Sequence, residues 1–315
     1  MNQASLLKLC GEPTRLRLLS LLSQGDLSVK DMMSILGQSQ PRISRHLKLL
    51  HEAGLIDRYP EGSWVYYRLV QADAIDRLLS PVMSSLQTDS QIIKDHQMRR
   101  TLMQAHAIEA ERYFNAEAEN WDNAIQASQQ AGVDAAIREI LQNQRIYSLL
   151  DLGTGTGHML EVLHPVYDKA LGIDRSQAML RYARARLDRL SSTKAEVRHG
   201  DILNLSLPSG HFDLITLHQV LHYFDDPASL FGEASRCLAP SGRLLIVDYA
   251  PHDFEALRDN HAHRRLGFET DFIARQLDVV GCDLIESQSV PVDLDGGHKL
   301  TVMLWLGQDR RIEVA

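Results

Sequence analysis

The sequence has little cysteine and no long apolar run. Cys10, Cys237 and Cys282 are odd in number and far apart, so they form neither a disulfide framework nor a Cys-x-x-Cys metal site. Apolar runs such as LLSLL at 18–22 and LITL at 214–217 fall far short of the roughly 20 residues that span a bilayer. The amino-terminal MNQASLLKLC lacks a basic segment leading into an apolar stretch. We therefore expect a cytoplasmic, unprocessed protein with no membrane partner.

A strong charge of one sign is also missing from the amino-terminal part. The 315 residues are about two domains' worth of chain, and their 44% hydrophobic and 23% charged content excludes disordered and fibrous proteins. The net charge is −8, yet residues 1–80 carry ten Lys and Arg against eight Asp and Glu, while the rest carries 23 against 33. Such a chain can bind nucleic acid at its amino-terminal end alone.

Residues 1–71 show short helices followed by a hairpin. Leucines at helical spacing predict one helix from Pro13, and a second is predicted over Val29–Leu36. A third follows Ser39, a residue type that can cap its first turn. Residues 55–70, LIDRYPEGSWVYYRLV, then alternate β-formers around a Pro-Glu-Gly turn. Helix, turn, helix and a two-stranded wing make up the first predicted domain.

The remaining chain divides into a connector and an α/β domain. Residues 72–130 contain almost no Gly or Pro, which predicts a helical connector, and the apolar face formed by Leu78, Leu79, Val82, Met83 and Leu86 makes it a candidate dimer surface. In residues 131–315, short apolar strands alternate with helices, which predicts a mostly parallel sheet with crossover helices. The last two strands, CDLIESQSVPV and KLTVMLWLG, are separated by a turn at 295–297 and should form an antiparallel hairpin on the sheet's edge.

The third predicted helix is the candidate DNA reader. It has no acidic residue before Glu52, and its polar side chains are of the types that reach base edges and phosphates in the major groove. The wing adds side chains suited to phosphate contacts. A solvated polar face is the alternative, but the order of helix, turn, helix and wing favours DNA binding. The predicted DNA-binding residues are Gln38, Ser39, Gln40, Arg42, Ser44, Arg45, His46, Lys48, Arg58, Tyr59 and Arg68.

These segments resemble the ArsR family of winged-helix repressors. The resemblance is carried by GEPTRLRLLSLL, QSQPRISRHLKLLHEAGLI and VYYRL within residues 5–70. It implies a homodimer that binds a palindromic operator in double-stranded DNA. Binding of an effector releases the operator or alters how it is bound. Many members sense metals, but SVKDMM lacks their cysteine pair, and His96, His106 and Glu109 do not match their histidine spacing. We therefore expect no metal site.

A glycine-rich loop follows the first strand of the α/β domain. Gly153, Gly155 and Gly157 allow a sharp turn and a close approach of backbone to a ligand. Asp151 precedes the loop, and Asp174 ends the next strand, where a carboxylate can accept both hydroxyls of a ribose. The Gly-x-Gly-x-x-Gly spacing of NAD-binding loops is missing.

Residues 112–308 resemble the Rossmann-like S-adenosylmethionine-dependent methyltransferases. The resemblance implies that the loop holds the methionine part of S-adenosylmethionine or S-adenosylhomocysteine, Asp174 the ribose, and Asp201 with Ile202 the adenine. The segment ERYFNAEAENWDNA at 111–124 would help to cover the cofactor. The cofactor-binding residues implied in this way are Asp151, Gly153, Thr154, Gly155, Gly157, Asp174, Arg175, Asp201, Ile202, His218, Gln219, Tyr113 and Trp121.

Catalytic residues are harder to predict, because methyl transfer needs little beyond positioning, a nucleophile and an occasional base. The candidates are His218, His222 and Tyr223, although a histidine at a strand end is often structural. A group of three further histidines could cap the substrate or be solvated. These are His252, His261 and His263.

Two interpretations of the fusion stay open. In the first, the chain is a transcriptional regulator whose operator binding responds to adenosylmethionine or adenosylhomocysteine. In the second, it is an active methyltransferase of a small-molecule acceptor, and the winged helix serves autoregulation or dimerisation. The first is preferred because an intact basic recognition helix accompanies an intact cofactor loop.

Overall fold

A computed structural model describes the chain at 9, 11–61, 64–70, 81–117, 127–142, 145–190, 194–293 and 299–312. It divides into two compact units, residues 1–108 and 109–315, and this division falls inside the predicted connector. Within the ranges described, no helix is long and apolar enough to cross a membrane. The wing residue Gly62, the apolar residues Leu78 and Leu79, the cover residue Trp121 and the hairpin turn at 295–297 lie outside them.

The first unit is a winged helix with its own core. Three leucine-rich helices pack around Leu18, Leu47 and other buried side chains, and β1, β3 and β2 form a small antiparallel sheet in that order. The wing is therefore three-stranded, because the two-residue β1 joins the predicted hairpin. Its elements are α2 (Pro13–Leu22), β1 (Leu27–Ser28), α3 (Val29–Leu36), α4 (Gln40–Glu52), β2 (Ile56–Glu61) and β3 (Trp64–Leu69).

Helix α6 (Ser90–Glu117) contributes residues to both units. In the first unit, Asp95 accepts two hydrogen bonds from the Arg17 guanidinium, at 2.6 and 2.7 Å. His96 bonds the Ser20 hydroxyl at 2.9 Å. Both partners lie on α2, so the amino-terminal part of α6 is fastened to the helix that packs beside α4.

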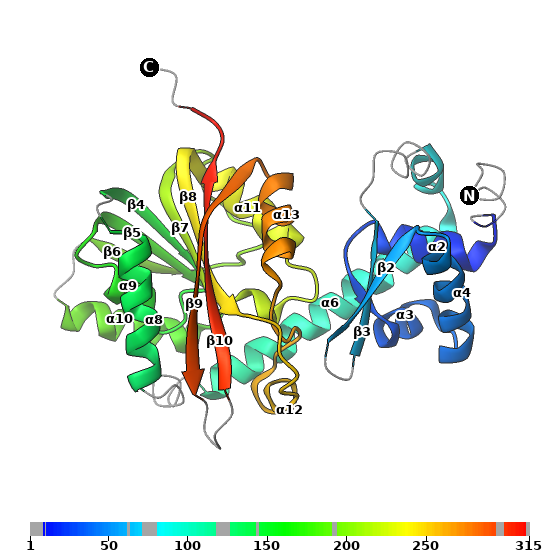
Figure 1. Ribbon diagram of the computed structural model, residues 1–315, viewed down its shortest axis with the longest axis horizontal. Helices are drawn as coiled ribbons and strands as arrows, with labels where there is room; N and C mark the ends of the chain where they lie inside the picture. The colour runs from blue at the N-terminus through cyan, green and yellow to red at the C-terminus, as the bar shows by residue number, and fades with distance from the viewer. Residues whose placement is uncertain are drawn as a thin grey trace. The chain divides into compact units, whose positions relative to one another are not determined.

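The second unit has a seven-stranded sheet in the order β6-β5-β4-β7-β8-β10-β9 (Figure 1). Neighbouring strands from β6 to β8 are parallel, while β10 pairs antiparallel with both β8 and β9, which confirms the predicted hairpin at the edge. The strands are β4 (Ile146–Leu152), β5 (Tyr167–Asp174), β6 (Ala195–His199), β7 (Phe212–His218), β8 (Leu238–Tyr249), β9 (Cys282–Asp293) and β10 (Lys299–Asp309).

Helices cover both faces of this sheet. Alternate strand residues point to opposite faces, so Leu149 and Leu245 pack with α8, α9 and α10, whereas Leu150 and Ile246 pack with α11 and α13. The helical elements are α8 (Ala127–Ile140), α9 (His158–Val162), α10 (Gln177–Arg189), η1 (Leu221–Tyr223), α11 (Ala228–Cys237), α12 (Ala256–His261) and α13 (Thr270–Val279). The carboxyl ends of five parallel strands consequently meet at one edge of the sheet, which we call the cofactor edge.

Candidate functional site

Helix α4 presents a polar face away from its apolar stripe. Ile43, Leu47 and Leu50 are buried, which leaves the opposite side of the helix to water. Ser39 occupies the position before the helix, but its side chain makes no cap hydrogen bond, contrary to the sequence-based expectation. The exposed candidates are Ser39, Gln40, Arg42, Arg45 and Lys48, and the half-buried ones are Gln38, Ser44 and His46.

His46 differs from the other α4 candidates. Its Nδ1 lies 3.4 Å from a Glu12 carboxylate oxygen, so the ring is turned toward the start of α2. Burial lowers the pKa of His46, with a smaller opposing effect from Glu12. Its placement fits a residue that orients α4 better than one that contacts a phosphate.

Two of the wing candidates form a small cluster on β2 and β3. The Arg68 guanidinium lies over the Tyr59 ring, 5.3 Å from its centroid. The Tyr59 hydroxyl donates to Asp26, which fixes the ring. Arg58, the preceding residue of β2, is exposed, and because successive strand residues alternate it points to the other face of the wing. This arrangement leaves Arg58 the most accessible cation of the predicted wing contacts.

The glycine-rich loop folds as the sequence predicts. All three glycines have left-handed backbones, with φ of 74° at Gly153, 52° at Gly155 and 81° at Gly157. A Cβ at Gly153 would lie 2.6 Å from a Val220 methyl group, whereas a Cβ at Gly155 would meet nothing within 4 Å. The loop is thus held tightly at Gly153 and is open over Gly155, where a ligand can approach the backbone.

Asp174 fixes this loop from the neighbouring strand. One carboxylate oxygen accepts the Gly155 N–H at 2.8 Å, and the other accepts the Ser176 N–H at 2.7 Å. Burial raises the pKa of Asp174, and the two backbone donors oppose that effect. Each oxygen still has a lone pair for a further donor, so this carboxylate can accept a diol.

The other predicted adenosine contacts lie along the same edge. Asp201 is exposed, and one of its carboxylate oxygens accepts the Leu203 N–H at 3.0 Å. Ile202 is buried in the core, and Arg175 is exposed. Gln219 follows β7 with a left-handed φ of 56°, an uncommon backbone for a residue other than glycine. Such local strain is often retained at ligand sites.

Asp151 is buried at the end of β4. Its carboxylate accepts the Thr216 hydroxyl at 2.7 Å, and burial raises its pKa to about 6 from an ordinary value of 3.8. The folded state therefore binds a proton more tightly than the unfolded chain. The free energy of unfolding should fall as pH rises from about 4 to about 6, and should stay lower above that interval.

Asp151→Asn removes the ionisable carboxyl group whose burial lowers the free energy of unfolding above about pH 4. Because asparagine is neutral at every pH, we expect the variant to be about 1–3 kcal/mol more stable than the wild type at pH 7.5, with the difference vanishing near pH 4. Urea unfolding at the two pH values measures it, with the exposed Asp168→Asn on β5 as control. The same change in stability at both pH values would contradict a raised pKa.

The three catalytic candidates lie at the carboxyl end of β7: His218 is its last residue, and His222 and Tyr223 belong to η1, which follows it. Burial lowers the pKa of His218 to about 3, with a further lowering from nearby His158. Burial raises the pKa of Tyr223 well above its ordinary value, with smaller contributions from the neighbouring tyrosines. His222 is 1% exposed, and its Nδ1 lies 2.8 Å from a carboxylate oxygen of Asp248. Among contacts between described residues, His222 is therefore the one of the three candidates that has a carboxylate partner.

Sequence reasoning missed several residues of this edge. Asp248 is the penultimate residue of β8, in the run IVDY, and the acid after an apolar run was the available signal. Asp134 on α8 bonds His158 at 2.8 Å, and Asn115 on α6 accepts the Ser176 hydroxyl at 2.6 Å. Neither contact has a sequence signature.

Two of the three other histidines belong to a buried cluster rather than to solvent. The His263 ring stacks on the His222 ring with centroids 3.9 Å apart. His252 lies 5.7 Å from the Tyr249 ring centroid. His261 is exposed, but its Nδ1 bonds the Tyr113 hydroxyl at 2.8 Å. The segment after β8 thus closes over the end of the sheet. In the described residues, no group of three or more His, Cys, Asp or Glu side chains could hold a metal ion.

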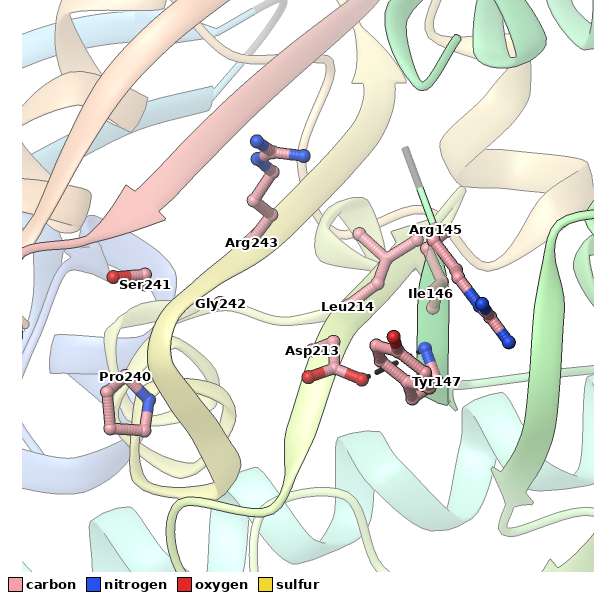
Figure 2. Close-up of a pocket in the computed structure, with 9 residues that line it drawn as sticks. All are labelled: Arg145, Ile146, Tyr147, Asp213, Leu214, Pro240, Ser241, Gly242 and Arg243. Carbon is pink, nitrogen blue, oxygen red and sulfur yellow. Dashed lines mark hydrogen bonds between the residues drawn. The ribbon is translucent and has the colours of Figure 1, made fainter. Parts of the chain in front are cut away.

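A hollow at the opposite edge of the sheet is a weaker candidate. Asp213 accepts backbone N–H groups from Tyr147 at 3.0 Å and Ser148 at 2.8 Å, so its carboxylate joins two strands (Figure 2). Ligand sites of parallel sheets lie at the carboxyl ends of the strands, whereas this hollow lies at the amino ends. Its lining comprises Arg145, Ile146, Tyr147, Asp213, Leu214, Pro240, Ser241, Gly242 and Arg243.

Comparisons with known proteins match the two units separately. Residues 12–58 match the model of the bacterial regulatory proteins of the arsR family, and residues 150–246 match that of a methyltransferase domain. The arsenical resistance operon repressor of Escherichia coli strain K12 is 51% identical over 65 residues, which are 20% of this chain and 56% of the repressor. A Mycolicibacterium smegmatis protein described as an S-adenosylmethionine-dependent methyltransferase is 30% identical over 98 residues, which are 31% of this chain and 36% of that protein.

A solved structure shares the fold of the second unit. It is a chain described as a methyltransferase, in complex with the Haloferax volcanii Trm112 methyltransferase activator. The TM-score is 0.52 at 19% identity, covering 62% of this chain and 96% of that one. The chain spans about half the length of the first curated relatives it matches, 45% and 56%.

Proposed function

Because an ArsR-type DNA-binding domain is fused here to an S-adenosylmethionine-dependent methyltransferase domain, we propose that the chain is a transcriptional regulator whose operator affinity changes when adenosylmethionine or adenosylhomocysteine binds. It acts as a homodimer on palindromic double-stranded DNA. Exposed Arg42 and Arg45 on α4 read the major groove, and Arg58 contacts a phosphate.

The cofactor edge fits such a nucleoside. The open backbone at Gly155 accommodates a ligand, and the Asp174 carboxylate can accept ribose hydroxyls beside it. Ile202 and Asp201 follow β6, where they can contact the adenine. His218 is the last residue of β7, and burial lowers its pKa, so its ring is neutral. Gln219 follows it with a left-handed backbone. When bound, adenosylmethionine supplies an electrophilic methyl group on a sulfonium.

The regulatory proposal rests on the hydrogen bonds that residues of helix α6 make in both units. At its carboxyl end, Asn115 accepts the Ser176 hydroxyl, and the Ser176 N–H is bound by Asp174. A ligand held by Asp174 therefore acts on a residue bonded to α6. At its amino end, Asp95 holds Arg17 of α2. One helix thus shares bonds with the cofactor edge and with the DNA-binding fold, and a ligand that favours one state of α6 shifts the operator affinity.

Asn115→Ala should uncouple the two sites. Allosteric coupling typically changes affinity by about 5–150-fold, and we expect the variant to reduce the ligand effect on operator affinity to about twofold or less. Adenosylhomocysteine affinity, measured by calorimetry, should change little because the Asp174 carboxylate remains. Gel-shift titrations with and without the ligand measure the coupling, using DNA selected from a random pool by the wild-type protein.

Gln104→Ala, exposed on the same helix, is the matched control and should retain the wild-type ligand effect. Full coupling in Asn115→Ala would remove α6 as the connecting element. No effect of saturating ligand on the operator affinity of the wild type, despite binding, would remove the regulatory proposal itself.

An active methyltransferase is the second candidate function, and the buried His222–Asp248 pair favours it. In this case the winged helix serves autoregulation or dimerisation, and the substrate is a small-molecule methyl acceptor. Incubation with methyl-labelled cofactor and cell extract tests for turnover. Absence of labelled product from a protein that binds the cofactor would exclude this second function.

A further inference from the structure

A histidine–carboxylate pair is buried at the carboxyl ends of β7 and β8. Asp248 is fully buried, and its carboxylate accepts the Tyr249 N–H at 2.8 Å as well as the His222 ring N–H at 2.8 Å. A carboxylate oxygen accepts hydrogen bonds, so this contact assigns the donor hydrogen to Nδ1 of His222. In that tautomer the ring has its lone pair on Nε2.

The Nε2 atom of His222 has no hydrogen-bond partner among the described residues, although it is buried. Leaving a buried acceptor without a donor is unfavourable, so a donor supplied by a ligand would stabilise the site. His263 Nδ1 and His252 Nε2 are also buried, and neither has a partner in the part of the chain that the structure describes. Three ring nitrogens without a described partner therefore lie in this one region of the fold.

Apart from the Asp248 carboxylate, the side chains whose rings lie against His222 are aromatic. The Tyr223 and Tyr249 ring centroids lie 4.1 and 5.6 Å from that of His222, and both tyrosines are half-buried. Burial raises the pKa of each tyrosine, so both keep their protons. Burial lowers the pKa of His252 to about 4 and that of His263 well below its ordinary value. Flat apolar rings with neutral polar edges suit a planar ligand that carries a hydroxyl group.

The pair also lies at the cofactor edge of the sheet. β7 and β8 are neighbours, and β7 pairs with β4, the strand that leads into the glycine-rich loop (Figure 1). His222 and Asp248 therefore stand beside the cofactor edge, on the side of β8. A second substrate placed there would be adjacent to a bound nucleoside.

On the basis of the proposed cofactor site, we propose that His222 Nε2 is the base for a phenol-class acceptor, a planar ring bearing a hydroxyl group, with Asp248 as its positioning residue. The acceptor ring enters beside Tyr223 and Tyr249. Its hydroxyl proton moves to Nε2, and an oxygen electron pair forms the new bond to the methyl carbon. The carbon–sulfur bond breaks with its pair left on sulfur, which becomes a neutral thioether. The imidazolium, stabilised by Asp248, then releases its proton to water.

The ionisation of a bound phenol tests the proposed base at equilibrium, without any methyl transfer. With adenosylhomocysteine bound, no methyl group is available, and 4-nitrophenol reports its own ionisation because its phenolate absorbs at a longer wavelength. At a pH below the solution pKa of the probe, we expect the wild type to raise the phenolate to phenol ratio by about tenfold over free probe, equivalent to one pKa unit. His222→Gln should abolish this rise, and Asp248→Asn should reduce it.

His211→Gln, on an exposed histidine that precedes β7, is the control and should ionise the probe as the wild type does. Calorimetry with adenosylhomocysteine is run on every variant. If the wild type does not bind adenosylhomocysteine, the proposed function is refuted. A wild type that binds the ligand but leaves the probe neutral, or His222→Gln that ionises it equally, would overturn the acceptor proposal alone.

Nitrogen NMR of the ring-labelled wild type tests the proposal without any substitution. We expect the Nδ1–H tautomer of His222, with an Nε2 resonance that shifts when 4-nitrophenol binds. The Nε2–H tautomer would overturn the proposal. With adenosylmethionine and a phenol that is methylated, His222→Gln should lower the rate by about 10²–10⁴-fold while cofactor affinity stays within about threefold.

Discussion

Asp174→Ala is expected to weaken adenosylhomocysteine binding by about 100-fold or more. A hydrogen bond to a charged group contributes about 1.5–3 kcal/mol, and the carboxylate can accept both ribose hydroxyls, so at least about 3 kcal/mol is lost. The substitution also removes the acceptors of the Gly155 and Ser176 N–H groups, which loosens the loop over which the nucleoside lies. Both effects act in the same direction.

Calorimetry measures the loss, and Asp168→Ala is the matched control. Asp168 lies on the same strand, β5, and is exposed near the strand's amino end. The control should bind the ligand with wild-type affinity, and both variants should bind operator DNA normally without ligand. Unchanged ligand affinity in Asp174→Ala would show that the nucleoside lies elsewhere.

Arg45→Ala should cause the largest loss of operator affinity. Arg45 is exposed on α4, clear of the buried stripe. A bidentate contact to a base contributes about 1–3 kcal/mol, and the proposed homodimer on a palindromic operator would lose it twice, about 2–6 kcal/mol in total. We therefore expect operator affinity to fall by at least about 30-fold, with adenosylhomocysteine affinity intact.

Fluorescence anisotropy with selected and scrambled duplexes separates base reading from charge. Arg189→Ala removes one exposed positive charge from α10 without touching α4 and should change operator affinity by less than about twofold. Equal losses in the two variants would mean that Arg45 contributes only general charge. Equal losses on selected and scrambled DNA would assign Arg45 to a phosphate.

Much of the fold follows from local sequence patterns. Val29–Leu36 is a helix with the predicted bounds, because Ser28 and Asp31 cap its start and Gly37 adopts a left-handed backbone at its end. The wing hairpin and the carboxyl-terminal hairpin also form as expected. The placement of β10 between β8 and β9, and the joining of the two-residue β1 to the wing, depend on tertiary pairing. No local pattern encodes either one.

The candidate site also contains some residues that a local sequence pattern identifies and others that only the tertiary structure brings together. The glycine-rich loop and Asp174 lie close together in the sequence and have strict backbone demands, so a pattern identifies them. The His222–Asp248 pair joins residues that meet only because β7 and β8 are neighbours in the sheet. Asn115 and Ser176 likewise meet across 61 positions. Contacts of this kind become visible only when the strand order is known.

β10 lies second from the edge of the seven-stranded sheet, between β8 and β9, so the sheet cannot be completed until β10 has been synthesised. Domains fold as units during synthesis, the amino-terminal one first, and the winged helix has a core of its own. β10 is translated after the other described strands, and its Met303 lies opposite Asp248 of β8. A nascent chain thus acquires its winged-helix fold before its methyltransferase sheet is complete. Under the proposed function, a chain truncated before β10 is expected to bind operator DNA without responding to a nucleoside.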